Sequence, residues 1–187
     1  MRVLIVDDES LLRMDLRDIL ESSGHEVVAE GTNGVEALSL CQEHQPDVVL
    51  MDVKMPELDG IEAARQLARL HIAPVVLLTA FSQEDLVEKA RQSGVYGYLI
   101  KPLREEALMP ALQMAIGRFQ EEKDLLEQMK SLENDLEERR FVEQAVNIIM
   151  KTYDLDENTA YERIRSFAMK KQMTLGKLAH QIVKSAK

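Results

Sequence analysis

Two hydrophobic periodicities alternate along residues 1–116. Short apolar runs rich in β-branched residues occur at Val3–Val6, Val27–Ala29, Val48–Met51, Val75–Leu78 and Tyr96–Ile100. Amphipathic stretches of helical period separate or follow them, at Leu11–Leu20, Val35–Cys41, Ile61–Leu70, Leu86–Ala90 and Ala107–Ile116. Five strands alternating with five helices predict an α/β fold with a five-stranded, parallel, doubly wound sheet. The first, third and fourth runs are almost wholly apolar and predict central strands, whereas Glu26 and Glu30 flank the second, a predicted edge strand.

From about Arg104 the pattern is helical throughout. The spacing of four, three and four residues predicts a coiled-coil seam at Leu125, Met129, Leu132 and Leu136. No Pro or Gly occurs between Arg118 and Tyr153, so the linker is predicted to be a continuous helix. Beyond it we expect a small bundle of three helices, at Phe141–Tyr153, Glu157–Lys171 and Leu175–Ala186, the last two capped by Asp156 and Thr174. The predicted organisation is a domain over residues 1–118, a coiled-coil linker over 119–138 and a helical domain over 139–187.

The charge distribution divides the chain in the same way. Residues 1–116 hold 10 basic and 20 acidic side chains, residues 117–138 hold 3 and 8, and residues 139–187 hold 10 and 5, which gives the net −10. A basic tail on an acidic protein is typical of a module that touches a polyanion, although the two halves attracting each other would produce the same asymmetry. No signal peptide or membrane-spanning segment is recognisable, and the single cysteine, Cys41, fits a reducing compartment, so we expect a cytoplasmic protein without membrane partners.

Polar groups follow the predicted strands at their carboxyl ends. The first strand is followed by Asp7 and Asp8, the third by Asp52, the fourth by Thr79 and the fifth by Lys101. Parallel strands bring such groups to one edge of the sheet. Acidic strand ends are often ordinary helix caps, but five matched positions in order favour a site. Carboxylates this close would repel one another unless a hard cation lay between them, and Mg²⁺ suits such oxygen ligands.

These side chains suit phosphoryl transfer. Asp52 is an adequate nucleophile once a metal offsets the charge on the transferring oxygens. Thr79 can donate a hydrogen bond to the new phosphoryl group, and Lys101 can supply a counter-charge. Little more is required, because phosphoryl transfer depends mainly on positioning and electrostatics.

The motifs of residues 1–118 closely resemble the receiver domain of response regulators. The carrying stretches are VLIVDDE (3–9), DVVLMDVKMPELDG (47–60), VVLLTAF (75–81) and YGYLIKP (96–102). The resemblance implies a flavodoxin-like fold, Asp52 as the phosphoacceptor, and a metal site formed by Asp7, Asp8, Asp52 and the backbone carbonyl of Lys54. It further implies a switch pair of Thr79 and Tyr98, a phosphoryl contact from Lys101, a cis bond to Pro102, and a sensor histidine kinase as donor.

The basic tail raises the question of DNA or RNA. A helix-turn-helix usually has Gly in a tight turn, but the turn TYDLDEN (152–158) is acidic and contains none. Small helical RNA-binding modules usually address unpaired loops, whose bases can be stacked. A DNA-binding output and a protein-partner output remain alternatives. An enzymatic output has no support beyond residue 116, where no nucleophile–base pair, Gly-rich loop or metal cluster is found, so no dedicated enzyme is expected.

Residues 139–183 resemble the ANTAR family of RNA-binding antitermination domains. The recurring features are Ala145, the run AY..IR..AM (160–169) and the closing LA..IV (178–183). The resemblance implies binding to paired RNA hairpin loops in nascent transcripts. Phosphorylation is expected to favour a homodimer whose coiled coil presents two such modules. Tyr161 is either a stacking residue or a core residue, and the residues expected to contact RNA are Lys151, Arg165, Lys170, Lys171, Thr174 and Lys177.

Overall fold

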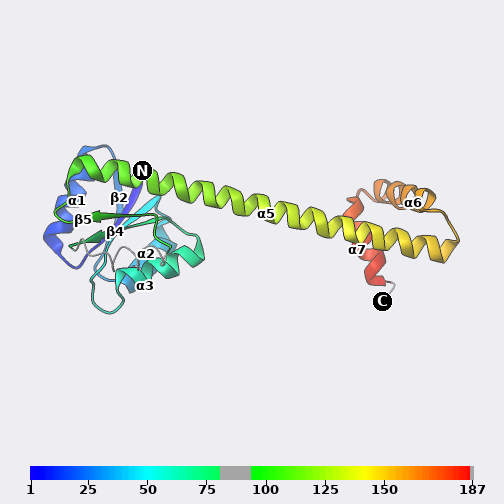
Figure 1. Cartoon of the computed structure of the whole chain (residues 1–187), viewed down its shortest axis with the longest axis horizontal. Helices are drawn as coiled ribbons and strands as arrows, with labels where there is room; N and C mark the ends of the chain where they lie inside the picture. Colours follow the sequence, from blue (N-terminus) through cyan, green and yellow to red (C-terminus); the bar gives the residue numbers. More distant parts are fainter. Residues whose placement is uncertain (81–93, 186–187) are drawn as a thin grey trace. The chain divides into compact units, whose positions relative to one another are not determined.

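The computed structural model describes residues 1–80 and 94–185, so the helix predicted at Leu86–Ala90 lies outside the described residues. The chain forms two compact units, Met1–Lys123 and Asp124–Lys187 (Figure 1). Each unit has its own hydrophobic core, and each is described by itself below.

The N-terminal unit is built on a parallel sheet. Its strands are β1 (Arg2–Val6), β2 (Glu26–Gly31), β3 (Val48–Asp52), β4 (Val75–Thr79) and β5 (Gly97–Ile100). Their order is β2-β1-β3-β4-β5, and every neighbouring pair is parallel. The predicted doubly wound fold is confirmed, as are the three central strands and the edge position of β2. The carboxyl ends of β1 and β3 lie side by side at the point where the strand order reverses, which is where such sheets place functional groups.

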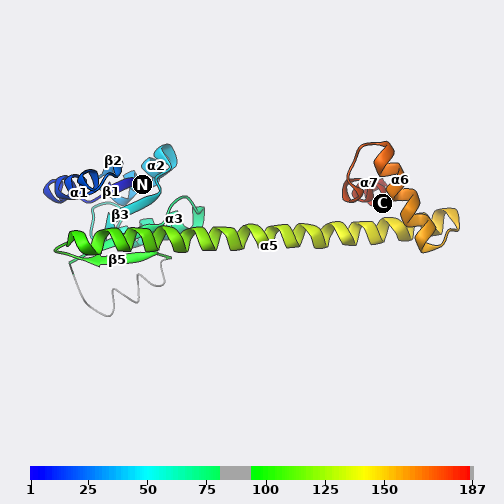
Figure 2. The same ribbon diagram turned by 90° about the horizontal axis from the view of Figure 1, so that it is seen from above.

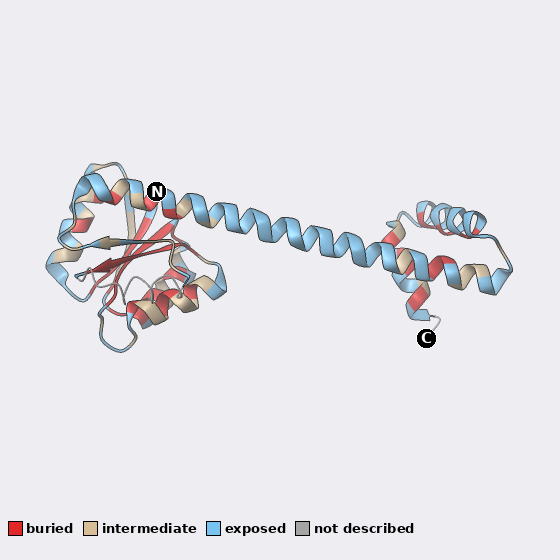
Figure 3. Ribbon diagram, in the orientation of Figure 1, coloured by how far each residue is buried: buried red, intermediate tan, exposed pale blue. Residues whose placement is uncertain are grey.

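Helices cover both faces of this sheet. Alternate side chains of each strand point to opposite faces. One face packs against α2 (Gly34–His44) and α3 (Gly60–Leu70) through Ala37, Ala63 and Leu67. The other packs against α1 (Ser10–Ser22) and the start of α5 (Glu105–Tyr153) through Leu16, Leu108 and Leu112. The three central strands, β1, β3 and β4, are accordingly the most completely buried part of the unit, whereas the edge strands β2 and β5 are partly exposed (Figure 3).

Helix α5 runs without a break from Glu105 to Tyr153 (Figure 2). The prediction of a continuous helical linker is confirmed, but the predicted separate helix at Phe141–Tyr153 is the end of α5 and begins at no break of its own. The buried residues of α5 belong to the first unit's core near its start and to the second unit's core near its end. The helix continues between them because backbone hydrogen bonding does not depend on which face is buried. Pro110 lies in the second turn of the helix, so α5 lacks the one backbone hydrogen bond that an amide at this position would donate to the carbonyl of Glu106.

The C-terminal unit packs the end of α5 against α6 (Glu157–Lys170) and α7 (Leu175–Ser185). Small buried residues let the three helices approach closely: Ala145, Ala160, Ala168 and Ala179. Both predicted caps are present, because the Asp156 side chain accepts from the Thr159 amide at 3.0 Å and Thr174 Oγ1 accepts from the Lys177 amide at 3.3 Å. Among the described residues, no helix has the length and apolar character needed to cross a membrane.

Candidate functional site

Lys101 joins the two buried carboxylates at the edge of the sheet. Its Nζ lies 2.7 Å from Oδ1 of Asp52 and 2.9 Å from Oδ2 of Asp7. Asp7 is fully buried and Asp52 is 7% exposed. β1 and β3 are adjacent strands that both end here, and the cis Lys101–Pro102 bond predicted from the resemblance follows β5. The structure thus brings Lys101 together with residues that are 94 and 49 positions away in sequence, as the strand-end pattern predicted.

The backbone around Asp52 is held by a close approach of Gly60. The Gly60 amide donates to the carbonyl of Val53 at 2.9 Å, and the Lys54 amide donates to Oδ2 of Asp52 at 2.8 Å. A Cβ at position 60 would lie 2.0 Å from the carbonyl oxygen of Asp52, so only glycine fits. Both carboxylate oxygens of Asp52 therefore have donors, and the first turn of α3 fixes the loop that carries them.

Burial sets the protonation chemistry of this pair. It raises the pKa of the Asp52 carboxyl above its usual value; Lys101 acts in the opposite direction, and the charge of Asp7 adds to the rise. Burial alone would lower the pKa of Lys101, but its hydrogen bonds to Asp52 and Asp7 outweigh burial and leave that pKa raised. Lys101 is therefore a permanent cation facing two carboxylates.

The predicted switch residues lie on neighbouring strands. In the register of β4 and β5, Leu77 pairs with Tyr98 and Thr79 pairs with Ile100. Since register partners share a face, Thr79 and Tyr98 point to the same side of the sheet, two positions apart. Thr79 is buried, with 8% of its surface exposed, whereas Tyr98 is 46% exposed. Tyr98 is therefore in an outward, half-exposed orientation, whereas Thr79 is enclosed.

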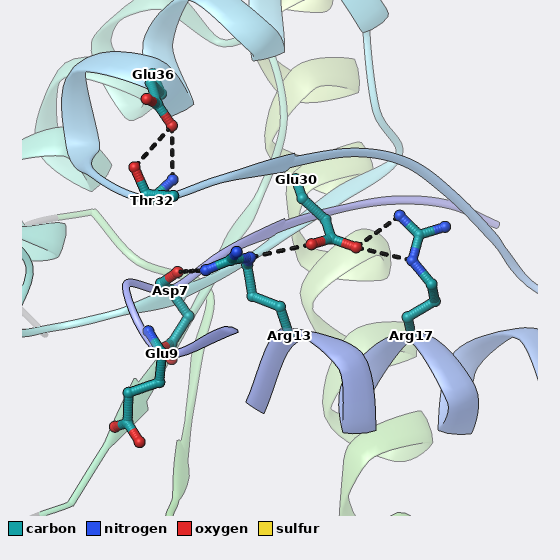
Figure 4. Close-up of polar contacts among 7 residues, drawn as sticks. All are labelled: Asp7, Glu9, Arg13, Arg17, Glu30, Thr32 and Glu36. Atoms are coloured by element: carbon teal, nitrogen blue, oxygen red, sulfur yellow. Dashed lines mark hydrogen bonds and ion pairs between the residues drawn. The ribbon is translucent and has the colours of Figure 1, made fainter. Parts of the chain in front are cut away.

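An arginine on α1 supports the site from the side of the edge strand. Arg13 donates from Nη1 to the carbonyl oxygen of Asp7 at 2.6 Å and from Nε to Glu30 at 3.0 Å (Figure 4). Arg17 holds the same glutamate through Nη2 at 2.6 Å. Sequence reasoning did not identify these residues. The available signal was two arginines at i and i+4, which share a helix face, together with an acidic residue near the end of β2.

The donor set fits a hard divalent cation. Asp7, Asp8 and Asp52 and the Lys54 carbonyl are all oxygen donors, and three carboxylates outnumber the Lys101 ammonium. Asp8 is exposed, and no group of three or more acidic, His or Cys side chains within residues 1–80 and 94–185 is arranged around a common point. Lys101 and the Glu9 amide instead occupy the two oxygens of Asp7. A cation at these residues would compete with Lys101 for the Asp7 carboxylate.

The predicted RNA-contact residues do not form one patch. All six are exposed. The helical period places Arg165 and Tyr161 on one flank of the buried face of α6, and Arg163, Phe167 and Lys170 on the other. Arg165 also pairs with Glu162 at 3.2 Å. Lys171 lies at the end of α6, Thr174 and Lys177 begin α7, and Lys151 belongs to the last turn of α5.

Comparison with known proteins covers both units. Residues 3–113 match the response regulator receiver domain, and residues 130–183 match the ANTAR domain. Transcriptional regulatory protein PdtaR of Mycobacterium tuberculosis is 43% identical over 98% of this chain and 90% of its own.

Solved structures resemble the N-terminal unit. The response regulator domain of Thermotoga maritima CheB has a TM-score of 0.58 and 29% identity over 63% of this chain and 96% of that chain. A chain of the CheX–CheY–BeF3–Mg²⁺ complex from Borrelia burgdorferi has a TM-score of 0.57 and 28% identity over 60% of this chain and 86% of that chain. The receiver match spans more than half of the chain, and the similarity to PdtaR extends through both units. The chain therefore belongs to the response regulators, as a receiver–ANTAR transcriptional regulator rather than a dedicated enzyme.

Proposed function

We propose that this protein is phosphorylated on Asp52 by a sensor histidine kinase, dimerises, and binds paired RNA hairpin loops to cause transcription antitermination. Residues 1–118 would receive the phosphoryl group, residues 119–138 would pair as a coiled coil, and residues 139–187 would bind RNA. The observation that carries the proposal is the Lys101 ammonium between Asp7 and Asp52, in a chain whose C-terminal part matches the ANTAR domain.

The phosphoryl step follows from the positions of these groups. A carboxylate oxygen of Asp52 forms a bond to phosphorus while the bond from phosphorus to the donor's imidazole nitrogen breaks. Mg²⁺, held by Asp7, Asp8, Asp52 and the Lys54 carbonyl, would offset charge on the transferring oxygens. The CheX–CheY complex from Borrelia burgdorferi contains Mg²⁺ together with BeF3, which supports this choice of metal. Lys101 keeps the carboxylates close before transfer and offers a counter-charge to the phosphoryl oxygens afterwards.

The switch would pass through Thr79 and Tyr98. Thr79 moves to donate a hydrogen bond to the phosphoryl group, and Tyr98 turns inward from its half-exposed position on the same face. The surface around β5 and the start of α5 changes as a result, since Tyr98 lines the same groove as Leu103 and Ala107. That change would favour pairing of the linker helices.

The decisive experiment is a binding measurement on the full chain. RNA containing two hairpins and matched duplex DNA are titrated with the protein, with and without a small phosphoryl donor and Mg²⁺, over a range of salt. We expect affinity for RNA that rises on phosphorylation, falls with salt and no longer responds to the donor in Asp52→Ala. Preference for duplex DNA would support the DNA-binding alternative, and binding to neither would support a protein partner.

A further inference from the structure

A cavity of about 450 Å³ opens between the three helices of the C-terminal unit. Its floor is apolar and includes Ile164 of α6 and Leu178 of α7, both nearly fully buried. A volume of this size falls within the range of small-molecule sites, roughly 300–1,000 Å³. The cavity is therefore large enough to accept a flat ring.

Two aromatic rings stand at its rim. Tyr153 is 52% exposed and Phe167 is 50% exposed, and both line the cavity beside its apolar floor. The Arg163 guanidinium lies 4.3 Å from the centre of the Tyr153 ring, and Lys171 Nζ lies 5.8 Å from that of Phe167. Exposed rings accompanied by cations are the usual platform for unpaired bases, whose faces stack on the rings while phosphates meet the charges.

Charge distinguishes this cavity from two other grooves of the same unit. Its described lining includes Arg163 and Lys170 and no acidic side chain. One of these grooves is lined by three acidic residues and one basic residue, Asp135, Glu138, Glu143 and Arg139, and the second by Glu143 and Glu157 with no basic residue. A polyanion would be repelled from both acidic grooves and drawn to the cavity. Tyr161, the ring singled out from the sequence, lines the two acidic grooves.

We propose that this cavity receives one unstacked base of an RNA loop. Phe167 is the stacking ring, Arg163 (held over the Tyr153 ring) and Lys170 meet the phosphates on either side of the base, and the Ser166 hydroxyl can hydrogen-bond its edge. The spacing of Arg163, Phe167 and Lys170, i, i+4 and i+7, is what places all three along one flank of α6. This inference rests on the proposed RNA-binding function and adds the place and the chemistry of recognition.

The test compares Phe167→Leu with the wild-type full chain. Leucine keeps apolar bulk but has no π face, and Phe167 is half exposed, so the fold should tolerate it; the melting temperature checks this. The probe is a labelled two-hairpin RNA selected by the wild-type protein from a pool with randomised loops. We expect Phe167→Leu to weaken binding by about five- to a hundredfold with an unchanged salt slope, because a stacking contact carries no charge. Phe167→Tyr should restore most of the affinity.

Two comparisons make the assignment specific. Tyr161→Leu removes an aromatic ring from the opposite flank of α6 and should leave RNA affinity unchanged. A set of RNAs is made, each with an abasic site at a different loop position. For one of them the wild-type protein should bind weakly, and Phe167→Leu should bind that RNA as tightly as the wild-type protein does. The base cavity would be overturned, and the proposed function left standing, if the wild-type protein binds RNA and Phe167→Leu binds it with the same affinity. A loss of RNA affinity in Tyr161→Leu instead would have the same meaning. Absence of any RNA binding by the phosphorylated wild-type protein would overturn both.

Discussion

Single residues at the carboxyl edge of the sheet are arranged for chemistry at some expense to the fold. Asp52 is 7% exposed beside Asp7, and burial raises its pKa, so its charged form is less favourable in the folded than in the unfolded chain. Lys101 compensates in part, through contacts of 2.7 and 2.9 Å to the two carboxylates. The proposed nucleophile is thus a group whose ionisation the fold resists, and this resistance can be measured as a change in the free energy of unfolding.

Asp52→Asn should stabilise the protein at neutral pH. A raised folded-state pKa means that the stability contributed by the protonated group is fully present below the unfolded-state pKa and is lost as the pH rises through the folded-state pKa. At pH values below the ordinary carboxyl pKa, Asp52→Asn should therefore leave the free energy of unfolding nearly unchanged. At pH values above the raised pKa, it should increase that free energy by about 1.4 kcal/mol for each unit by which the pKa is raised. Urea unfolding at several pH values measures this. A gain that is largest in acid would contradict it.

Two glycine substitutions should have opposite effects. Gly60→Ala places a Cβ 2.0 Å from the Asp52 carbonyl oxygen, so the loop must shift; we expect a loss of roughly 1–3 kcal/mol and slower phosphorylation by a small phosphoryl donor. Gly117→Ala is the matched control, because nothing lies within 4 Å of its Cβ position in α5. It should stabilise by up to about 1 kcal/mol and leave phosphorylation unchanged. Equal effects of the two substitutions would show that the contact at Asp52 is unimportant.

At the scale of elements, the hydrophobic pattern predicts a helix or strand well where it reflects backbone hydrogen bonding. It predicts the ends of an element poorly where it reflects only which face is buried. The strands were predictable because β-branched runs bounded by turns have one common outcome, and the carboxylate and Lys101 positions then followed from the parallel arrangement. The unity of α5 was partly missed, since a change of buried face resembles a helix boundary in sequence. The contact of Arg13 with a backbone carbonyl depends on side-chain geometry that residue types alone do not specify. The separation of Arg165 from Lys170 was predictable, because five positions along a helix place two side chains on opposite flanks.

The contact between the sheet and the middle of α5 makes a prediction at this scale. Tyr96, next to β5, donates to Glu122 at 2.6 Å, and its ring meets Phe119 edge-on at 5.4 Å. Burial and this hydrogen bond raise the pKa of Tyr96, so the hydroxyl stays a donor. Tyr96→Phe keeps the ring and should cost about 1 kcal/mol of stability and speed amide exchange over residues 117–123.

Glu122→Gln is the partner variant, since an amide oxygen can still accept the bond without a charge. It should show a smaller version of both effects. Exchange over residues 117–123 that is the same in Tyr96→Phe and the wild-type protein would mean that the sheet does not hold this part of the helix.

For the whole molecule, one helix belongs to both units and carries an apolar seam that the single chain leaves uncovered. Leu125, Met129, Leu132 and Leu136 are between 51% and 64% exposed, although their spacing is that of a coiled coil (Figure 3). Covering them with the same helix of a second copy would bring two ANTAR units onto one RNA. Two linked weak sites gain affinity through effective concentration, so dimerisation alone can act as the switch.

Leu132→Lys should separate phosphorylation from output. A charge in the middle of the seam opposes pairing, so the phosphorylated variant should stay monomeric by mass measurement while Asp52 is still phosphorylated at the wild-type rate. Its affinity for RNA with two hairpins should fall by about 10²–10⁴-fold, whereas its affinity for a single hairpin should equal that of the wild-type protein, because only the linkage between sites is lost.

Asn134→Lys is the control variant, because it adds the same charge on the outward face of the helix, and it should change neither the mass of the phosphorylated protein nor its affinity for the two-hairpin RNA. A monomeric Leu132→Lys that binds the two-hairpin RNA as tightly as the wild-type dimer would rule out linkage as the basis of the switch, and would require phosphorylation to act within each ANTAR unit.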